Sequence, residues 1–272
     1  MKIKTKIKTK TKIIIIIVIV TLLLMIVMLR INRYCTNKIN NFWLEKTPRL
    51  SVKASEITQF NPKHKIVKGI DTLTIDNGGD TVLLLIYGRK ASMYRAGPIC
   101  SAFHPLPATI ILFDFSGVFD GKKTFETMIS DGQTICNWIR TEYPTKKIVA
   151  VGHSFGASVA LYLDVDAYCL IGGVYTVGGL VGGLFGCLPF LDSKYDVKRA
   201  LDLNTFKHGA KLLVMHGILE QALTYKESEK LVEHANKVGL NAKLALMRVG
   251  HSFWETDPVP PYNAMYDFIS GL

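Results

Sequence analysis

The sequence lacks the patterns that mark several common classes of protein. Its five cysteines form no Cys-x-x-Cys pair and their number is odd, so neither a disulfide framework nor a zinc site is indicated. No Gly-x-x-x-x-Gly-Lys-Ser/Thr loop is present, which excludes a P-loop NTPase. The spacing of the histidines is not that of metal ligands. We therefore interpret six of them as structural or surface residues, and expect neither a metal nor a cofactor: His64, His104, His153, His208, His216 and His234.

The positive charge of the chain is concentrated at one end. The formal net charge is +11, and six lysines lie within the first twelve residues: Lys2, Lys4, Lys6, Lys8, Lys10 and Lys12. Removing these six charges from +11 leaves +5 for the other 260 residues. Since no basic stripe interleaved with aromatic residues occurs in that remainder, we expect no nucleic-acid partner.

A long apolar run follows the lysines. Residues 13–29 contain no charged residue, and Thr21 is the single polar residue among them. At about 1.5 Å per residue such a helix spans roughly 26 Å, close to the hydrocarbon thickness of a thin bilayer. A single segment in lipid is helical because its backbone must satisfy its own hydrogen bonds. We predict a basic tail over residues 1–12 and a transmembrane anchor over residues 13–29.

A cleaved signal peptide is the alternative to an anchor. Signal peptides usually have a shorter apolar core and a small-x-small cleavage site, whereas this run is followed by Arg-Ile-Asn-Arg-Tyr. Lysine and arginine are more numerous before the run than after it, which predicts a single-pass, type II orientation with the main domain lumenal or extracellular. The absence of an Asn-x-Ser/Thr sequon among the eleven asparagines does not support that orientation.

Beyond a polar stalk over residues 30–65, short apolar runs alternate with longer mixed segments. This alternation is typical of a parallel sheet with crossover helices, and we expect one such domain over residues 66–272. Helices are predicted over 123–143 and 226–238, where apolar residues fall on one face. Strands are predicted over residues 81–87, 109–114, 147–151, 168–171, 211–215 and 243–249. In an open sheet of this kind the ligand binds beyond the carboxyl ends of the strands.

One such strand end carries the motif Gly-His-Ser-Phe-Gly, residues 152–156. A sharp strand-to-helix turn strains its central serine, and the glycines two before and two after it remove side chains that would collide. The backbone N–H of Phe155 would then lie at a helix N-terminus and face a developing oxyanion. An ordinary Gly/Ser turn is the alternative. We predict that Ser154 is a nucleophile.

A serine nucleophile needs a base, and the base needs an acid that orients it. His251 follows the last predicted strand, and Glu220 follows the strand before it. The chain order is thus serine, acid, histidine, with the residues one to two strand–helix units apart, as in Gly-x-Ser-x-Gly hydrolases. We predict that His251 is the base and Glu220 the acid. Asp196 and Asp202 are the next candidates for the acid.

Several segments resemble the α/β-hydrolase superfamily over roughly residues 80–272. Residues 213–220, Leu-Val-Met-His-Gly-Ile-Leu-Glu, resemble the segment that ends strand seven, where that family usually has aspartate at the Glu220 position. Val-Gly-His at 249–251 resembles the catalytic-histidine loop. Tyr-Gly-Arg at 87–89 resembles the His-Gly-x oxyanion loop, and residues 112–117 resemble an Asp-x-x-Gly segment. The chain is most similar in style to small, membrane-anchored α/β-hydrolase-domain proteins with an N-terminal single-pass helix.

The resemblance implies a mostly parallel open sheet with helices on both faces and a short lid. It implies an oxyanion hole formed by the backbone N–H groups of Arg89 and Phe155, which the change to Tyr87 leaves in place. The expected function is a membrane-anchored serine hydrolase that cleaves an ester or thioester, with a small-molecule or lipid ester as substrate. The alternative is a catalytically inactive α/β-hydrolase fold that serves as a membrane-tethered binding or scaffold protein.

Residues 169–191 carry no charge and are rich in glycine. Gly178, Gly182 and Gly186 have the spacing of a transmembrane contact motif. A second span would, however, put Ser154 and Glu220 on opposite sides of the membrane. We therefore expect a buried strand followed by a small apolar lid. That lid could line an acyl-binding groove or dip into the membrane, and the groove is the interpretation we favour.

Overall fold

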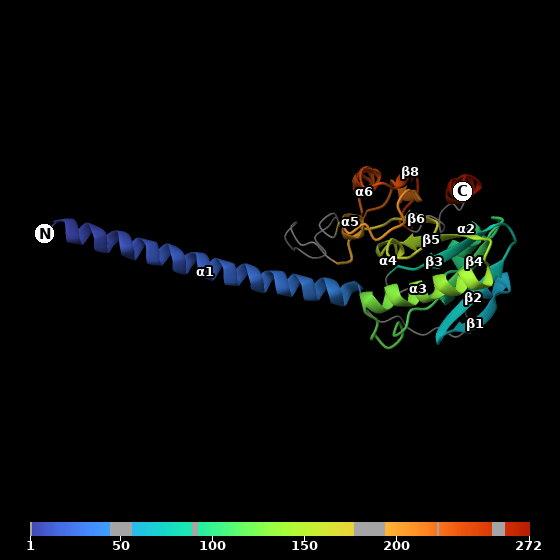
Figure 1. Cartoon of the computed structure of the whole chain (residues 1–272), viewed down its shortest axis with the longest axis horizontal. Coiled ribbons are helices and arrows are strands. Elements are labelled where there is room, and N and C mark those ends of the chain that lie inside the picture. Colours follow the sequence, from blue (N-terminus) through green and yellow to red (C-terminus); the bar gives the residue numbers. More distant parts are fainter. Residues whose placement is uncertain (1, 44–55, 89–91, 177–193, 222, 252–258) are drawn as a thin grey trace.

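The computed structural model describes residues 2–43, 56–88, 92–176, 194–221, 223–251 and 259–272. A long helix, α1 (Lys2–Trp43), precedes a domain built on one sheet (Figure 1). Within the described residues this sheet has eight strands in the order β1-β2-β4-β3-β5-β6-β7-β8. The strands are β1 (Lys63–Val67), β2 (Ile70–Asp76), β3 (Thr81–Ile86), β4 (Thr109–Phe113), β5 (Lys147–His153), β6 (Ala167–Ile171), β7 (Lys211–Gly217) and β8 (Asn241–Met247).

The sheet is mostly parallel. All pairings from β4 across β3, β5, β6 and β7 to β8 are parallel, while β2 pairs antiparallel with β4 and with β1. Parallel strands place all their carboxyl ends at one edge of the sheet, so the loops after β3, β5, β7 and β8 lie at the same end of the domain.

Helices cover both faces of the sheet because successive strand residues point to opposite faces. On β3, Val82, Leu84 and Ile86 join one buried cluster, and Leu83 and Leu85 join the other. The first cluster is covered by α3 (Phe125–Glu142), α4 (Gly156–Ala160), α5 (Val197–Asp202) and α6 (Tyr225–Lys237). The second is covered by α2 (Gly97–Phe103) and α7 (Val259–Ser270).

The predicted fold class is confirmed: the sheet is mostly parallel, with helices on both faces. The six predicted strands are present with ends shifted by at most two residues, and the helices predicted over 123–143 and 226–238 correspond to α3 and α6. The antiparallel pair β1 and β2 was not predicted, and β1 begins at Lys63, before the expected start of the domain. The lid expected before residue 191 lies mostly outside the described residues.

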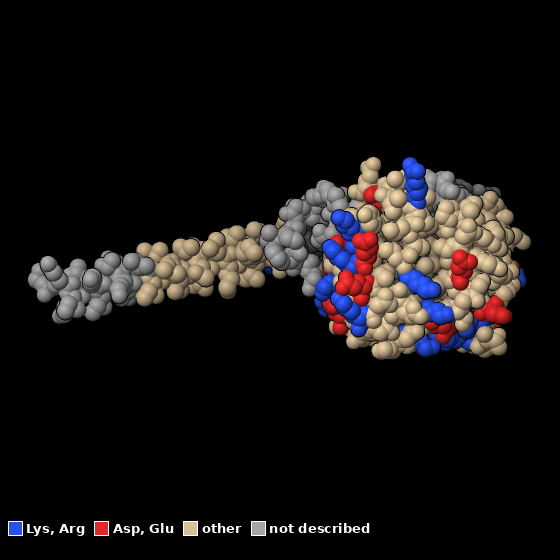
Figure 2. Space-filling view, turned by 90° about the horizontal axis from the view of Figure 1, so that it is seen from above, with Lys and Arg blue, Asp and Glu red and all other residues tan. Residues whose placement is uncertain are grey.

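α1 continues through the expected anchor into the segment expected to be a stalk. Among the described residues its span Ile14–Tyr34 is the one helix long and apolar enough to cross a membrane, with a mean hydropathy of 3.2. None of this span is buried against the domain, and its middle carries no charged side chain on the face that Figure 2 shows. On the same view of the domain, cationic and anionic side chains are interspersed, with no large patch of one sign.

Candidate active site

Ser154 lies on a strained turn between β5 and α4. Its φ is 52°, in the left-handed region that non-glycine residues rarely adopt. Such a conformation costs on the order of 1–3 kcal/mol and persists only where the surrounding structure enforces it. The Ser154 N–H donates a hydrogen bond to the carbonyl of Ile171, at 2.8 Å, which ties the turn to the end of β6.

The two glycines of the motif are required by close backbone contacts. A Cβ atom added to Gly156 would lie 2.1 Å from the carbonyl oxygen of Ile86, and one added to Gly152 would lie 2.6 Å from Cα of Ala157. A Cβ on Gly88, directly after β3, would lie 3.1 Å from Cβ of Ser154. The backbone after β3 therefore passes beside the serine, where the predicted oxyanion loop begins.

Glu220 and His251 are joined by a short hydrogen bond. The distance from His251 Nδ1 to Glu220 Oε2 is 2.5 Å, with Nδ1–H as the donor if the carboxylate is ionised. The Glu220 side chain is 1% exposed and that of His251 is 34% exposed. The geometry thus combines a buried carboxylate with an imidazole that reaches solvent, and the imidazole can exchange a proton at Nε2.

Gly172, directly after β6, packs against this pair. Its φ is 54°, and a Cβ added to it would lie 3.1 Å from both Cε1 and Nδ1 of His251 and 3.7 Å from Glu220 Oε2. Its N–H donates to the carbonyl of Met215 at 3.0 Å. A side chain at position 172 would therefore push against the imidazole.

His216 lies at the end of β7, directly before the turn that carries Glu220. This histidine is fully buried, with Nδ1 2.8 Å from Ser228 Oγ on α6 and Nε2 3.1 Å from the carbonyl oxygen of Leu223. Burial lowers the pKa of His216, so the neutral ring is favoured. His216 therefore lies inside the fold and links the end of β7 to Leu223 and to α6, beyond the turn that carries Glu220.

The structure brings four of the five predicted site residues to the carboxyl ends of the strands: Ser154, Phe155, Glu220 and His251. Arg89 lies outside the described residues. Among the described residues, Ser154 Oγ and His251 are not hydrogen-bonded. Asp202, an alternative acid, is paired with His234 and Lys198 instead, at 3.3 and 2.7 Å. Asp196 is buried immediately before α5.

His153 was interpreted from the sequence as a structural or surface residue. In the structure it lies next to His251, one of the predicted site residues. The centroid of its ring lies 5.0 Å from that of His251. The signal in the sequence was its position next to Ser154, but contact with His251 arises only when β5 and the loop after β8 come together. Gly172 was missed for the same reason.

A buried polar group flanks the predicted oxyanion loop. Asp114, directly after β4, accepts a hydrogen bond from the N–H of Met93 at 2.8 Å. Tyr87 Oη, Ser92 Oγ and the second Asp114 oxygen are buried without a hydrogen-bond partner among the described residues. Burial raises the pKa of Tyr87 well above its usual value. These side chains come from both flanks of residues 89–91 and from the neighbouring strand end.

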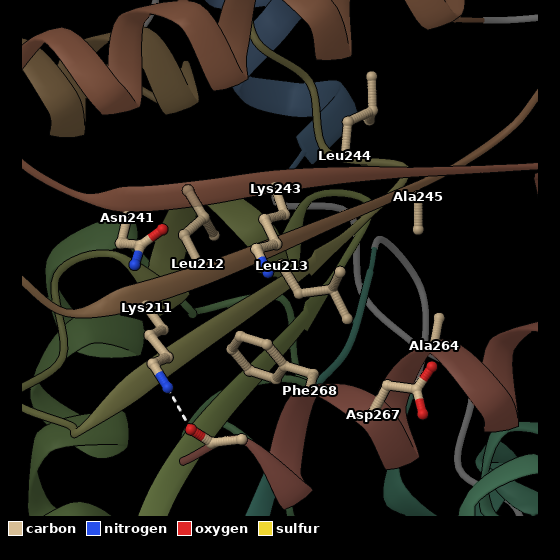
Figure 3. A pocket seen from close by; sticks show the side chains of 11 residues that line it. Lys211, Leu212, Leu213, Asn241, Lys243, Leu244, Ala245, Ala264, Asp267 and Phe268 are labelled. Carbon is tan, nitrogen blue, oxygen red and sulfur yellow. Dashed lines mark hydrogen bonds between the residues drawn. The ribbon is translucent and has the colours of Figure 1, made fainter.

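A pocket of about 530 Å³ lies between β7, β8 and α7, away from these residues (Figure 3). Leu213 and Phe268 face each other across it, and Lys211 and Asp267 lie toward opposite ends. None of Ser154, Glu220 and His251 lines it. Within the described residues, no three His, Cys, Asp or Glu side chains gather as metal ligands would.

The sequence matches no family model and no curated protein. Solved structures are nevertheless similar to it. An esterase from Pyrococcus furiosus is 18% identical with a TM-score of 0.64, covering 83% of this chain and 97% of that one. An α/β-hydrolase from Vibrio vulnificus is 13% identical with a TM-score of 0.67, covering 86% and 92%. Esterase 2 from Thermogutta terrifontis, phosphoramylated by tabun, is 14% identical with a TM-score of 0.58, covering 78% and 93%. The chain has the α/β-hydrolase fold.

Asp114 should make stability depend on pH. Burial, with repulsion from Asp71, raises its pKa to about 6, although the Met93 hydrogen bond and the Lys123 cation act in the opposite direction. Between pH 4 and 6 the unfolded chain ionises this group while the folded chain keeps the proton, so stability falls as pH rises. Asp114→Asn should therefore stabilise the domain by on the order of 2 kcal/mol at pH 7.5 and by much less at pH 4, measured by denaturant unfolding.

The exposed Asp120 offers the matched control, because Asp120→Asn replaces a carboxylate at the surface rather than in the interior. A gain for Asp114→Asn that is the same at pH 4 and pH 7.5 would contradict the assignment.

Proposed function

We propose that this protein is a membrane-anchored serine hydrolase that cleaves an ester or thioester, with Ser154, His251 and Glu220 as its catalytic residues. The observation that carries the proposal is the 2.5 Å hydrogen bond that a buried Glu220 accepts from His251, at the same sheet edge as the strained Ser154 turn. A serine, a histidine and a carboxylate in this chain order are the parts that acyl transfer through a serine requires.

In the proposed reaction Ser154 Oγ attacks the carbonyl carbon of the substrate, and His251 Nε2 accepts the serine proton. Glu220 stabilises the imidazolium that forms and holds Nδ1 in the protonated tautomer. The N–H groups of Arg89 and Phe155 donate to the oxyanion of the tetrahedral intermediate. His251 then gives its proton to the departing alkoxide or thiolate, which leaves the acyl group on Ser154.

Water completes the cycle by the same steps. His251 takes a proton from the water as it attacks the acyl carbon, and returns a proton to Ser154 Oγ when the acyl–oxygen bond breaks. The carboxylic acid product is released and the free serine is regenerated, so the reaction requires no cofactor. Glutamate can serve as the acid, because a carboxylate one methylene longer than aspartate still reaches the imidazole.

The substrate class is proposed from the anchor and the fold. The esterases of Pyrococcus furiosus and Thermogutta terrifontis share this fold, which supports ester cleavage. The apolar span of α1 supports a chain held at a membrane, where lipid or acylated esters are concentrated. We propose such a substrate, met on the lumenal or extracellular side in the type II orientation.

A fluorophosphonate probe tests the nucleophile. The wild-type chain should be labelled covalently, and Ser154→Ala should not, because the variant lacks the hydroxyl that attacks phosphorus. Gel fluorescence measures the label, and circular dichroism checks that both chains are folded. A folded wild type that stays unlabelled would favour the inactive scaffold, and labelling that survives in Ser154→Ala would place the nucleophile elsewhere.

Replacing the acid tests Glu220. In Glu220→Gln a neutral amide takes the place of the carboxylate and cannot stabilise the imidazolium, so kcat for a chromogenic ester should fall by about 10³-fold or more. Asp202→Asn removes the alternative acid and should leave kcat unchanged, since Asp202 is paired with His234 and Lys198. The opposite pattern would move the acid to Asp202.

Protease protection tests the anchor and its orientation. In sealed microsomal vesicles the hydrolase domain should be protected from added protease until detergent opens the vesicle, because the positive tail stays on the cytoplasmic side. Deleting residues 13–29 should release the chain from alkaline-washed membranes. Digestion of the domain in intact vesicles would reverse the orientation, and a wild-type chain that washes off would refute the anchor.

A further inference from the structure

His153 lies at the junction of three segments of the site. It is the last residue of β5 and directly precedes Ser154. A Cβ added to Gly88, after β3, would lie 3.5 Å from His153 Nδ1, so the ring also lies beside the start of the oxyanion loop. On its third side the ring contacts His251, with centroids 5.0 Å apart and planes at 44°.

This ring contact is made with the His251 imidazole itself. Residues 252–258, which follow His251 directly, lie outside the described part of the chain. Among the described residues, Glu220, Gly172 and His153 lie next to the His251 side chain.

These three contacts do different things. The Glu220 hydrogen bond fixes the position of Nδ1 but leaves the imidazole free to pivot about that atom. Gly172 leaves room for the imidazole, since a Cβ added there would lie 3.1 Å from Cε1. The His153 ring provides a second surface against which the imidazole rests. Displacing the atom that accepts the serine proton by about 1 Å costs on the order of 10²-fold in rate.

The His153 ring provides these contacts without charge. Burial, reinforced by the neighbouring His251, lowers the pKa of His153 to about 3. The ring is therefore neutral wherever His251 could act as a base, and it does not oppose the positive charge that His251 gains when it accepts a proton. A lysine or arginine in the same place would oppose that charge.

We infer that His153 is a positioning residue that sets the orientation of the His251 imidazole toward Ser154, through the contact between the two rings. The inference rests on the proposed serine hydrolase function. It gives the residue before the nucleophile a part in catalysis that is separate from the turn itself.

The test compares three substitutions in the full-length chain. His153→Leu removes the ring, His153→Phe keeps an aromatic ring, and His153→Asn removes the ring but keeps a polar side chain. With p-nitrophenyl acetate, kcat of His153→Leu should fall by about 10- to 100-fold while KM stays within about twofold, since proton transfer is impaired and binding is not. The Phe variant should retain most of the wild-type kcat, because it keeps the ring contact, whereas kcat of the Asn variant should fall as that of His153→Leu does.

His104 supplies a matched control. Its ring also contacts an aromatic ring, that of Phe60, at a centroid distance of 5.0 Å, but far along the chain from the site residues. His104→Leu should leave kcat unchanged even if it lowers the melting temperature. If both leucine variants lower kcat in proportion to lost stability, His153 has a structural role alone and the inference is wrong.

The outcomes also separate this inference from the proposed function. A folded wild type that neither hydrolyses the ester nor reacts with the fluorophosphonate overturns both. A wild type that does both, with kcat of His153→Leu also at the wild-type value, overturns the positioning role alone. If His153→Leu does not fold, wild-type kcat in His153→Asn overturns it.

Discussion

Glu220 is 1% exposed, and a carboxylate removed from water to this extent is stable only when hydrogen bonds replace its hydration. Its Oε2 atom is hydrogen-bonded to His251, while Oε1 is buried without a hydrogen-bond partner among the described residues. Removing the imidazole would therefore leave the whole carboxylate uncompensated. This one contact joins the turns after β7 and β8, and the position of the His251 imidazole depends on it.

The backbone around Ser154 and Glu220 is also constrained. The left-handed φ of Ser154 is held by a hydrogen bond to β6 and by two glycines that allow the strand ends and α4 to approach closely. Gly217 does the same for the turn that carries Glu220, because a Cβ there would lie 2.3 Å from the carbonyl oxygen of Val249. The fold thus places strain at Ser154 and close packing beneath Glu220 and His251, an arrangement suited to the catalytic roles that we propose for these residues.

The features that the sequence predicted are those encoded locally. The parallel strands are continuous apolar runs, and the Ser154 motif follows one of them, so both were predictable. β1 was missed because Lys63, His64 and Lys65 are exposed and polar, as suits an edge strand. Contacts formed through space, such as His153 or Gly172 with His251, depend on how separate strand ends meet, and no local pattern encodes that.

Trapping the acyl-enzyme tests the central claim most directly. If Ser154 is the nucleophile, stopping turnover of p-nitrophenyl acetate with acid should leave an acetyl group on the peptide that contains Ser154, and mass spectrometry would locate it. An acetyl group on another residue, or steady hydrolysis with no acetylated peptide in a trap able to capture it, would contradict the account.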